Sequence, residues 1–310
     1  MAITGTTSGT GLVAAGAVAR LGARVLLLNR PSPRAEAGLA RLQEAHPDAT
    51  FVSVDCDLQS FTSVRAAAAT VRSMCPDGLD VLCNNAGVMA LPDRATADGF
   101  DVQMQTNHLS HFLLTHELME TLERAAELRG EARVVNHSSV ARMSPGKKLR
   151  AEYLERRGGD LGGDSASMFT GGARWVRYNQ SKLANCAFTA ALHERLHARG
   201  SKVKALVAHP GLSATELQVK STRDGGMGHF MTRMLMRLGQ SPEDGAMGIL
   251  ACMCVKDAQS GAFYGPGSGA FAMKGPARPF ALESFYDNPE TRALLWTKSS
   301  EAVGLVKGAS

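Results

Sequence analysis

The chain alternates two hydrophobic patterns along almost its whole length. Short runs rich in Val, Leu and Ile, typical of buried parallel strands, are separated by longer Ala- and Leu-rich stretches with helical spacing. Strands are expected near residues 1–4, 24–29, 50–55, 79–83, 132–137, 203–208 and 261–264. Helices are expected near 10–21, 35–45, 60–74, 99–127, 178–199 and 241–255. The pattern predicts an α/β fold over 1–310 as a single domain: a Rossmann-like, doubly wound, mostly parallel sheet of about seven strands with helices on both faces.

Two segments interrupt this alternation. Residues 144–174 are polar and glycine-rich, which predicts an inserted long loop with at most one or two helical turns. Residues 222–240 contain an apolar helical face, which indicates either a helix packed on the core or a Met-lined lid over a substrate. The apolar positions of that face are Phe230, Met231, Met234, Leu235 and Leu238. We expect both segments to flank the substrate opening.

Composition narrows the class of partner. Hydrophobic residues make up 44% and charged residues 20% of the 310, close to the averages of soluble globular proteins. The net charge is +5, but the basic residues are dispersed, and only Lys147, Lys148 and Arg150 form a cluster. This distribution argues against a nucleic acid as partner.

The cysteines and the apolar runs bear on metal binding and location. Six cysteines form no CxxC pair and have no histidine at a ligand spacing, so no metal site is expected. The longest apolar run, Met247 to Val255, is too short to span a bilayer, and no charged-then-apolar leader precedes the first motif. We therefore expect a soluble, cytoplasmic protein without a transmembrane segment.

A glycine-rich turn follows the first predicted strand. Gly5, Gly9 and Gly11, with Thr7 and Ser8 between them, lead directly into a helical pattern. Such a turn lets the backbone approach a pyrophosphate, whose charge is stabilised at the helix N-terminus. Only three residues precede Thr4, so either the first strand is very short or the N-terminus is incomplete.

The ends of the next strands predict the type of nucleotide. The second strand ends in Asn29-Arg30, with no carboxylate to hold the ribose hydroxyls of NAD. A guanidinium at that point suits a 2′-phosphate, so NADP(H) is favoured, although a solvated arginine would give the same pattern. Further along, Asp57-Leu58 is expected to contact adenine, and Asn85-Ala86-Gly87 to approach the cofactor closely.

Tyr178 and Lys182 are the candidate catalytic pair. At i and i+4 they lie on one face of a predicted helix. A free tyrosine has a pKa of about 10, and favouring phenolate near neutrality requires about three pKa units, roughly 4 kcal/mol. We expect the Lys182 ammonium to supply much of this. The spacing alone also arises by chance, so the remaining motifs must decide.

The order of the motifs resembles that of the short-chain dehydrogenase/reductase family. The glycine-rich turn is followed by Asn84-Asn-Ala-Gly87, Asn107 in a long helix, Ser138-Ser139 after a strand, the Tyr178 motif and His209-Pro210-Gly211. Three phrases look like the retinol dehydrogenase-like branch: Thr106 to Thr115, Tyr178 to Asn185 and Leu294-Leu-Trp296. The resemblance covers nearly the whole chain.

The resemblance implies specific roles. Tyr178 would be the proton donor or acceptor at the substrate oxygen, and Ser139, rather than Ser138, would hydrogen-bond that oxygen. Lys182 would lower the phenol pKa and hold the nicotinamide ribose, and Asn107 would anchor a water. Pro210, Gly211 and Thr215 would lie at the nicotinamide.

The resemblance favours carbonyl–alcohol chemistry on a small apolar, for example retinoid- or lipid-like, substrate. The alternatives are an NADPH-dependent double-bond reductase resembling protochlorophyllide reductase and a non-catalytic nucleotide-binding regulator. A regulator would not need the set of Asn107, Ser139, Tyr178 and Lys182. The oligomeric state stays open, because the insertion lies just before the helix that many family members use to pair subunits.

Overall fold

A single eight-stranded sheet organises the structure, a computed structural model that describes residues 1–143, 146–167, 171–211, 239–267 and 273–306. Its strand order is β3-β2-β1-β4-β5-β6-β7-β8, and all neighbours are parallel except β7 and β8. The strands are β1 (Ala2–Thr4), β2 (Val25–Asn29), β3 (Phe51–Asp55), β4 (Val81–Asn84), β5 (Ala132–His137), β6 (Val203–Ala208), β7 (Ala262–Pro266) and β8 (Ala277–Ala281). The predicted doubly wound, mostly parallel sheet is confirmed, with one strand more than expected.

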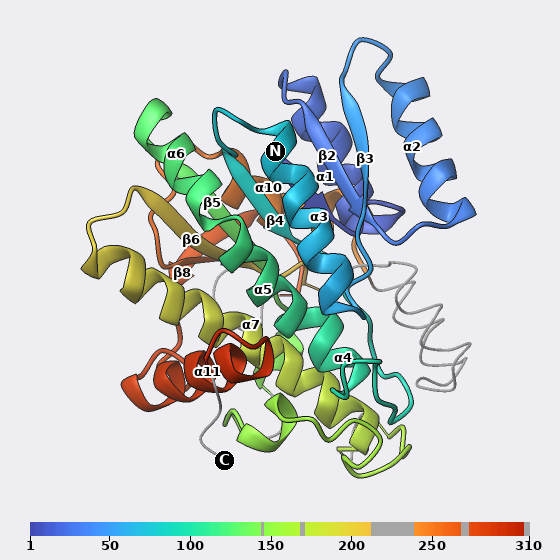
Figure 1. The fold of residues 1–310 in the computed structure, drawn as a ribbon, viewed down its shortest axis with the longest axis vertical. Helices are drawn as coiled ribbons and strands as arrows, with labels where there is room; N and C mark the ends of the chain where they lie inside the picture. Colours follow the sequence, from blue (N-terminus) through green and yellow to red (C-terminus); the bar gives the residue numbers. More distant parts are fainter. Residues whose placement is uncertain (144–145, 168–170, 212–238, 268–272, 307–310) are drawn as a thin grey trace.

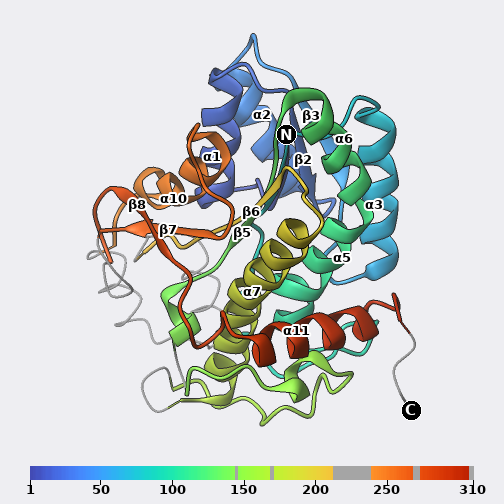
Figure 2. The same cartoon turned by 90° about the vertical axis from the view of Figure 1, so that its left-hand side faces the viewer.

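Helices cover both faces of the sheet (Figures 1 and 2). One face carries α1 (Gly9–Arg20), α2 (Pro33–Ala45) and α10 (Pro242–Cys254). The other carries α3 (Phe61–Met74), α5 (Ser110–Glu117), α6 (Met119–Arg129) and α7 (Ala173–Ala198). The C-terminal helix α11 (Pro289–Ala302) lies outside α7 (Figure 2). No helix within the described ranges combines the length and the apolar character that crossing a bilayer requires.

The first strand is short but central. Ala2, Ile3 and Thr4 are fully buried, and Ile3 pairs with Leu27 of β2 on one side and Cys83 of β4 on the other. Three residues are enough here because both neighbours satisfy their backbone groups. The glycine-rich turn therefore starts from the middle of the sheet.

The predicted helix over 99–127 is wrong as a single element. The chain instead forms α4 (Val102–Met104), a π-helical turn η1 (Gln105–Leu109), α5 and α6. A π turn carries one extra residue per turn, and such turns are often found at functional sites. Asn107 lies at its centre.

Other elements differ from the prediction at their ends or were not predicted. Helix α7 begins at Ala173 rather than near 178. Strand β8 was missed because it is a half-exposed edge strand containing Pro279, without a period-two pattern of apolar residues. Helix α11 was also missed. A 3-10 turn, η2 (Val140–Met143), lies just before the predicted insertion, and a second one, η3 (Ala151–Leu154), lies among its described residues.

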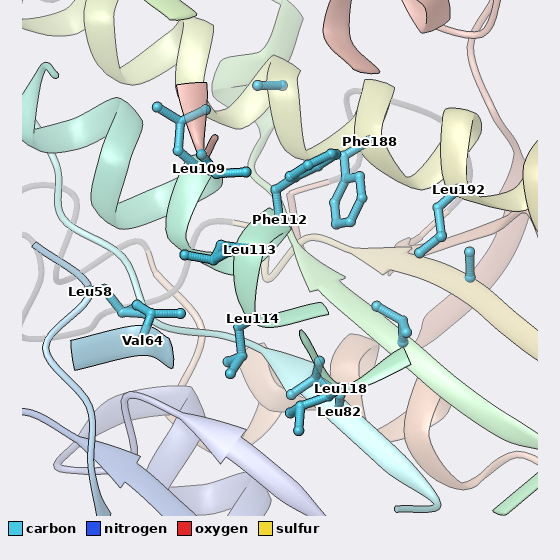
Figure 3. Close-up of a cluster of buried hydrophobic side chains, with 14 of the residues drawn as sticks. Leu58, Val64, Leu82, Leu109, Phe112, Leu113, Leu114, Leu118, Phe188 and Leu192 are labelled. Atoms are coloured by element: carbon cyan, nitrogen blue, oxygen red, sulfur yellow. The ribbon is translucent and has the colours of Figure 1, made fainter. Parts of the chain in front are cut away.

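The core beneath α5 and α7 fixes the helix that carries Tyr178. Phe112 of α5 faces Phe188 of α7 with ring centroids 5.1 Å apart (Figure 3). Trp296 of α11 packs edge-on against Phe112 at 5.2 Å. Aromatic pairs of this kind add about 0.5–1.5 kcal/mol each beyond the burial of their area. Helix α7 is therefore held by α5 and by α11 through this aromatic cluster.

Candidate active site

The predicted site residues of the described chain gather at the carboxyl edge of the sheet. The strand order reverses between β1 and β4, which makes this the topological switch point where open α/β sheets bind ligands. This edge is where the loops begin that follow the parallel strands β1 to β6. Thr215 and most of the predicted lid, residues 222–238, lie outside the described residues.

The glycine-rich turn is tightly packed and opens onto a helix N-terminus. Gly5 and Gly9 have positive φ, and a Cβ on Gly5 would lie 2.8 Å from Ala86. A Cβ on Gly11 would lie 2.3 Å from the carbonyl oxygen of Gly5. Ser8 is the N-cap of α1 but its side chain makes no capping bond to that helix, unlike Ser32 at the start of α2. The amides of α1 therefore face the edge of the sheet without a side-chain cap, as an anion site requires.

Asn85 braces the turn. Its Nδ2 donates to the carbonyl oxygens of Thr4 at 2.9 Å and Gly5 at 3.2 Å. Its Oδ1 accepts from Thr10 Oγ1 at 3.1 Å and from His137 Nδ1 at 2.9 Å. Since all its donors and acceptors are directed to the protein, Asn85 shapes the turn with its side chain.

Asn29 has a similar structural part. Its Oδ1 accepts from the Thr6 amide and its Nδ2 donates to Thr6 Oγ1, both at 2.8 Å. A side chain used in this way fixes the height of the turn above β2. Only the neighbouring Arg30, which is exposed, is available to a ligand from the Asn29-Arg30 pair.

Arg34 is a second cation at this end of the site, and the sequence interpretation missed it. It lies in the first turn of α2, and its Nη2 donates to Ser8 Oγ in the glycine-rich turn. The signal was a second arginine four residues after Arg30 in a turn that starts with Ser32-Pro33. Two guanidinium groups therefore border the place where the second strand ends.

The loop after β3, where the sequence predicts contact with adenine, holds the Asp57 side chain by a hydrogen bond of its own. Asp57 Oδ1 accepts from the Gln59 amide at 2.9 Å, while the Asp57 amide donates to Ser63 Oγ at 2.9 Å. Leu58 is buried and its carbonyl oxygen accepts from Ser110 Oγ at 2.7 Å. These bonds hold the loop after β3 against the helices α3 and α5.

The predicted catalytic residues lie near one another at the same edge of the sheet: Ser139, Tyr178 and Lys182. The Ser139 hydroxyl is near enough to the Tyr178 phenol to lower the pKa of that phenol, and it accepts from the Ala141 amide at 3.2 Å. Lys182 Nζ lies 5.9 Å from the centroid of the Tyr178 ring and donates to the His137 carbonyl oxygen at 3.1 Å. A Cβ on Gly87 would lie 3.2 Å from that Nζ, so a glycine there leaves room beside the ammonium.

Ser138 is directed elsewhere. Its Oγ donates to the carbonyl oxygen of Lys182 at 2.8 Å and accepts from Cys186 Sγ at 3.1 Å. It ties β5 to α7 and holds the register of the two elements. Of the two serines, Ser139 is the one beside Tyr178.

The titration of the pair differs from the sequence expectation. Burial raises the pKa of Tyr178 to about 12, and the hydrogen bond from Ser139 lowers it only in part. Burial lowers the pKa of Lys182 to about 8. The causes of the phenol shift are burial and Ser139, and the expected contribution of the Lys182 ammonium is not among them, so its effect on Tyr178 stays a prediction.

Asn107 is fully bonded within the π turn. Its Oδ1 accepts from the Val88 amide at 2.8 Å, and its Nδ2 donates to the Val88 carbonyl oxygen at 2.9 Å. Nδ2 also donates to Ser181 Oγ at 2.8 Å. Its carbonyl oxygen accepts from His111 Nδ1 at 3.0 Å. The side chain joins the loop after β4 to α7, and both of its amide hydrogens are used within the protein.

Pro210 and Gly211 follow β6 at the same edge. The Gly211 amide donates to His209 Nδ1 at 3.1 Å, and the Pro210 carbonyl oxygen accepts from Gln240 at 2.8 Å. Gly211 has φ +64, and a Cβ there would lie 2.4 Å from the Met273 carbonyl oxygen. This turn has no room for a larger residue.

A buried ion cluster beside Tyr178 anchors the insertion. Arg177 is fully buried, and its Nη1 donates to the carbonyl oxygens of Leu161 at 3.0 Å and Gly163 at 2.8 Å. Its Nε lies 3.3 Å from Asp101 and its Nη1 3.5 Å from Asp93. The sequence interpretation missed this cluster, since a lone arginine before a tyrosine carries no signal of burial.

Comparisons with known proteins agree with the geometry. The family described as short chain dehydrogenase matches residues 1–152. Retinol dehydrogenase 12 of Mus musculus is 32% identical over 305 residues, which cover 98% of this chain and 85% of the relative. Polyprenol dehydrogenase of Homo sapiens is 30% identical over 309 residues, covering 98% and 84%. The crystal structure of an uncharacterized protein from Mycobacterium paratuberculosis has a TM-score of 0.73 at 32% identity and covers 98% of this chain and 92% of that one.

The alignments with these relatives include the whole sheet and the helix with Tyr178, and not only the glycine-rich turn. The identity with retinol dehydrogenases 11, 12 and 14 agrees with the three phrases in the sequence. The chain therefore belongs to the short-chain dehydrogenase/reductase family, in its retinol dehydrogenase-like branch, and is an oxidoreductase of carbonyl and alcohol groups that uses a nicotinamide cofactor.

Proposed function

We propose that the protein is an NADP(H)-dependent oxidoreductase that interconverts a carbonyl and an alcohol on an apolar substrate. The observation that carries the proposal is the grouping of the Ser139 hydroxyl, the Tyr178 phenol and the Lys182 ammonium, whose Nζ lies 5.9 Å from the Tyr178 ring. Two neighbouring hydroxyls can both be directed to a third oxygen atom, that of a carbonyl.

The loops at the carboxyl edge of the sheet form the proposed cofactor site. The N-terminus of α1, with Gly5, Thr7, Ser8, Gly9 and Gly11, takes the pyrophosphate. Arg30 takes the 2′-phosphate, and no carboxylate at the end of β2 opposes it. Toward the nicotinamide, the backbone of Asn85, Ala86 and Gly87, the Lys182 ammonium and the Pro210-Gly211 turn complete the site, with Asp57 and Leu58 at the adenine.

Each catalytic side chain has one task. When bound, the cofactor supplies or accepts hydride. Ser139 donates a hydrogen bond to the carbonyl oxygen, and Tyr178, protonated because its pKa is raised, delivers the proton that the developing alkoxide needs. Lys182 supplies positive charge beside the phenol and returns a proton to the phenolate that Tyr178 becomes, and the Asn107 carbonyl oxygen would hold a water through which Lys182 is reprotonated.

An apolar cluster around Tyr178 supports an apolar substrate. Met89, Ala90 and Trp175 pack with Tyr178, and Ala141 lies against them. The Trp175 and Tyr178 rings are 6.0 Å apart and nearly perpendicular. The names of two relatives, retinol dehydrogenase and polyprenol dehydrogenase, specify apolar alcohols and support the same class.

The proposal is tested with Tyr178→Phe and a panel of carbonyl compounds. General acid catalysis contributes about 10²–10⁴-fold, so kcat should fall by that factor while the Kd of NADPH stays nearly constant. Tyr264→Phe, a buried tyrosine of β7, is the matched control and should keep normal turnover. The panel contains all-trans-retinal, an aliphatic aldehyde, a quinone, a steroid ketone and protochlorophyllide.

The panel also separates the alternatives. Reduction of protochlorophyllide alone would favour the double-bond reductase. NADPH binding without turnover of any compound would favour a nucleotide-binding regulator. Near-normal turnover by Tyr178→Phe would refute the proposed acid.

A further inference from the structure

A second buried arginine lies behind Ser139. Arg142 in η2 is fully buried. Its Nε and Nη2 donate to the two carboxylate oxygens of Glu283, at 2.6 and 3.1 Å, and its Nη1 donates to the Ser139 carbonyl oxygen at 3.2 Å. Its guanidinium also stacks on the Phe263 ring, 4.4 Å from the centroid. The side chain thus joins a carboxylate, an aromatic ring and the backbone of the candidate catalytic serine.

The geometry of this contact is well defined. A planar guanidinium that binds a carboxylate with two parallel bonds is fixed in both position and orientation. The Ser139 carbonyl oxygen accepts from it and also from the Arg142 amide at 3.1 Å. Two donors on one carbonyl oxygen hold the Ser139 peptide plane, and this plane sets the direction of the Cα–Cβ bond that carries the hydroxyl.

Glu283 is held in turn by the C-terminal segment. It follows β8, and its carbonyl oxygen accepts from the amides of Tyr286 and Asp287 at 3.1 and 3.0 Å in the turn that leads to α11. Helix α11 packs on α7 through Trp296 and Phe188. The same C-terminal segment therefore contacts the Ser139 loop through Glu283 and the Tyr178 helix through α11.

We propose that Arg142 and Glu283 form a positioning pair, which holds the Ser139 hydroxyl at Tyr178 and so acts on turnover through Ser139. The inference rests on the proposed function, since it requires that Ser139 take part in catalysis. Neither side chain contacts the Tyr178 phenol, and both act through the backbone of Ser139.

The test is a double-mutant cycle between Arg142 and Ser139. Kinetics are measured with NADPH and the panel carbonyl that the wild-type enzyme reduces fastest, for the wild type, Ser139→Ala, Arg142→Met and the double variant. A displacement of a catalytic group by about 1 Å can lower turnover about a hundredfold. Arg142→Met should therefore lower kcat about 10–100-fold. In the Ser139→Ala background the same change should lower kcat less than about threefold, because the group it positions is gone.

Stability is separated from positioning with two further variants. Arg133→Met also removes a buried arginine. Arg133 pairs with Glu131 at the N-terminal end of β5, away from Ser139, so this variant should lower Tm while kcat stays normal. Arg142→Met with Glu283→Met removes both charges, so Tm should recover relative to Arg142→Met alone while kcat stays low. Glu283→Gln keeps an oxygen acceptor and should lie between the wild type and Arg142→Met in kcat.

The outcomes distinguish the two proposals. An equal loss of kcat from Arg142→Met with and without Ser139 would overturn the positioning pair and leave the catalytic role of Ser139 intact. Recovery of kcat together with Tm in the doubly apolar variant would also overturn it. Normal turnover by Ser139→Ala would overturn both the positioning pair and the role of Ser139 in the proposed function.

Discussion

Arg177 of α7 should contribute strongly to the stability of the insertion that it contacts. The change Arg177→Met leaves the Asp101 carboxylate buried without its cation and leaves the carbonyl oxygens of Leu161, Gly163 and Leu91 without a donor. Removing one partner of a buried ion pair costs about 3–5 kcal/mol. An unfolding entropy of about 2.1 cal/mol/K per residue converts this, for a chain of 310 residues, into a decrease in Tm of about 5–8 °C.

The loss should be local as well as global. Asp93 accepts from the amides of Gly159, Leu161 and Gly163 at 2.8–3.0 Å, and Arg177 lies against the same carboxylate. In Arg177→Met these three amides should lose protection against hydrogen exchange, while amides in β4 and β5 keep theirs.

The assay pairs calorimetry with hydrogen exchange. Arg199→Met is the matched control, since Arg199 terminates the same helix, is half exposed and pairs with Glu123 at the surface. An exposed pair contributes at most about 1 kcal/mol, so Tm should change by less than about 2 °C. If Arg177→Met behaved like Arg199→Met in both measurements, the inferred anchoring of the insertion by a buried cation would be wrong.

Three further predictions concern the cofactor, the proton and the first strand. Arg30→Ala should weaken NADPH binding by about 1.5–3 kcal/mol, roughly 10–150-fold, and leave NADH nearly unchanged in the same fluorescence titration; a similar loss for both would reject the 2′-phosphate contact. Between pH 6 and 8, kcat/KM for alcohol oxidation should rise about tenfold per unit, because a Tyr178 pKa of about 12 leaves little phenolate, whereas kcat/KM for carbonyl reduction should stay flat and then fall as Lys182 loses its proton above a pKa of about 8; oxidation that does not change with pH, or reduction that rises with pH, would contradict these protonation states. Ile3→Ala should cost about 2–5 kcal/mol in denaturant unfolding, since Ile3 is fully buried between β2 and β4, and a loss below about 1 kcal/mol would show that β1 is not a central strand.

The elements predicted best from the sequence are those buried on both faces. Strands such as Val25–Asn29 and Val203–Ala208 are mostly apolar runs, so their boundaries agree with the prediction to within one residue. Strand β8 has an exposed edge and a proline, and its pairing with β7 depends on a distant part of the chain rather than on a local pattern. The π turn around Asn107 was hidden for a different reason, since its apolar spacing continues on both sides as in an ordinary helix.

The candidate site could be predicted as a set of residue types, but not in its bonding. The sequence predicted Asn29, from the end of the second strand, and Asn107, from the family motifs, as site residues. Both side chains are used to hold loops together. Which atom of a side chain remains available depends on neighbours that are far away in the sequence, such as Thr6 for Asn29 and Ser181 for Asn107. The pKa of Tyr178 was misjudged in the same way, because the degree of burial is a property of the assembled site.

The burial of Arg142 and the burial of Arg177 have a common physical origin. The segments that follow β4 and β5 and the insertion lack a sheet or helix partner for many of their carbonyl oxygens, and these oxygens cannot be buried without donors. A guanidinium offers five donors from one side chain, so Arg177 can serve Leu161, Gly163 and Leu91, and Arg142 can serve Ser139 and Glu283. Each arginine is close in the chain to a candidate catalytic residue, Arg177 next to Tyr178 and Arg142 three residues after Ser139. Irregular backbone at this edge therefore needs buried cations, and their placement beside the hydroxyl pair makes the stability of the loops and the geometry of the site depend on the same side chains.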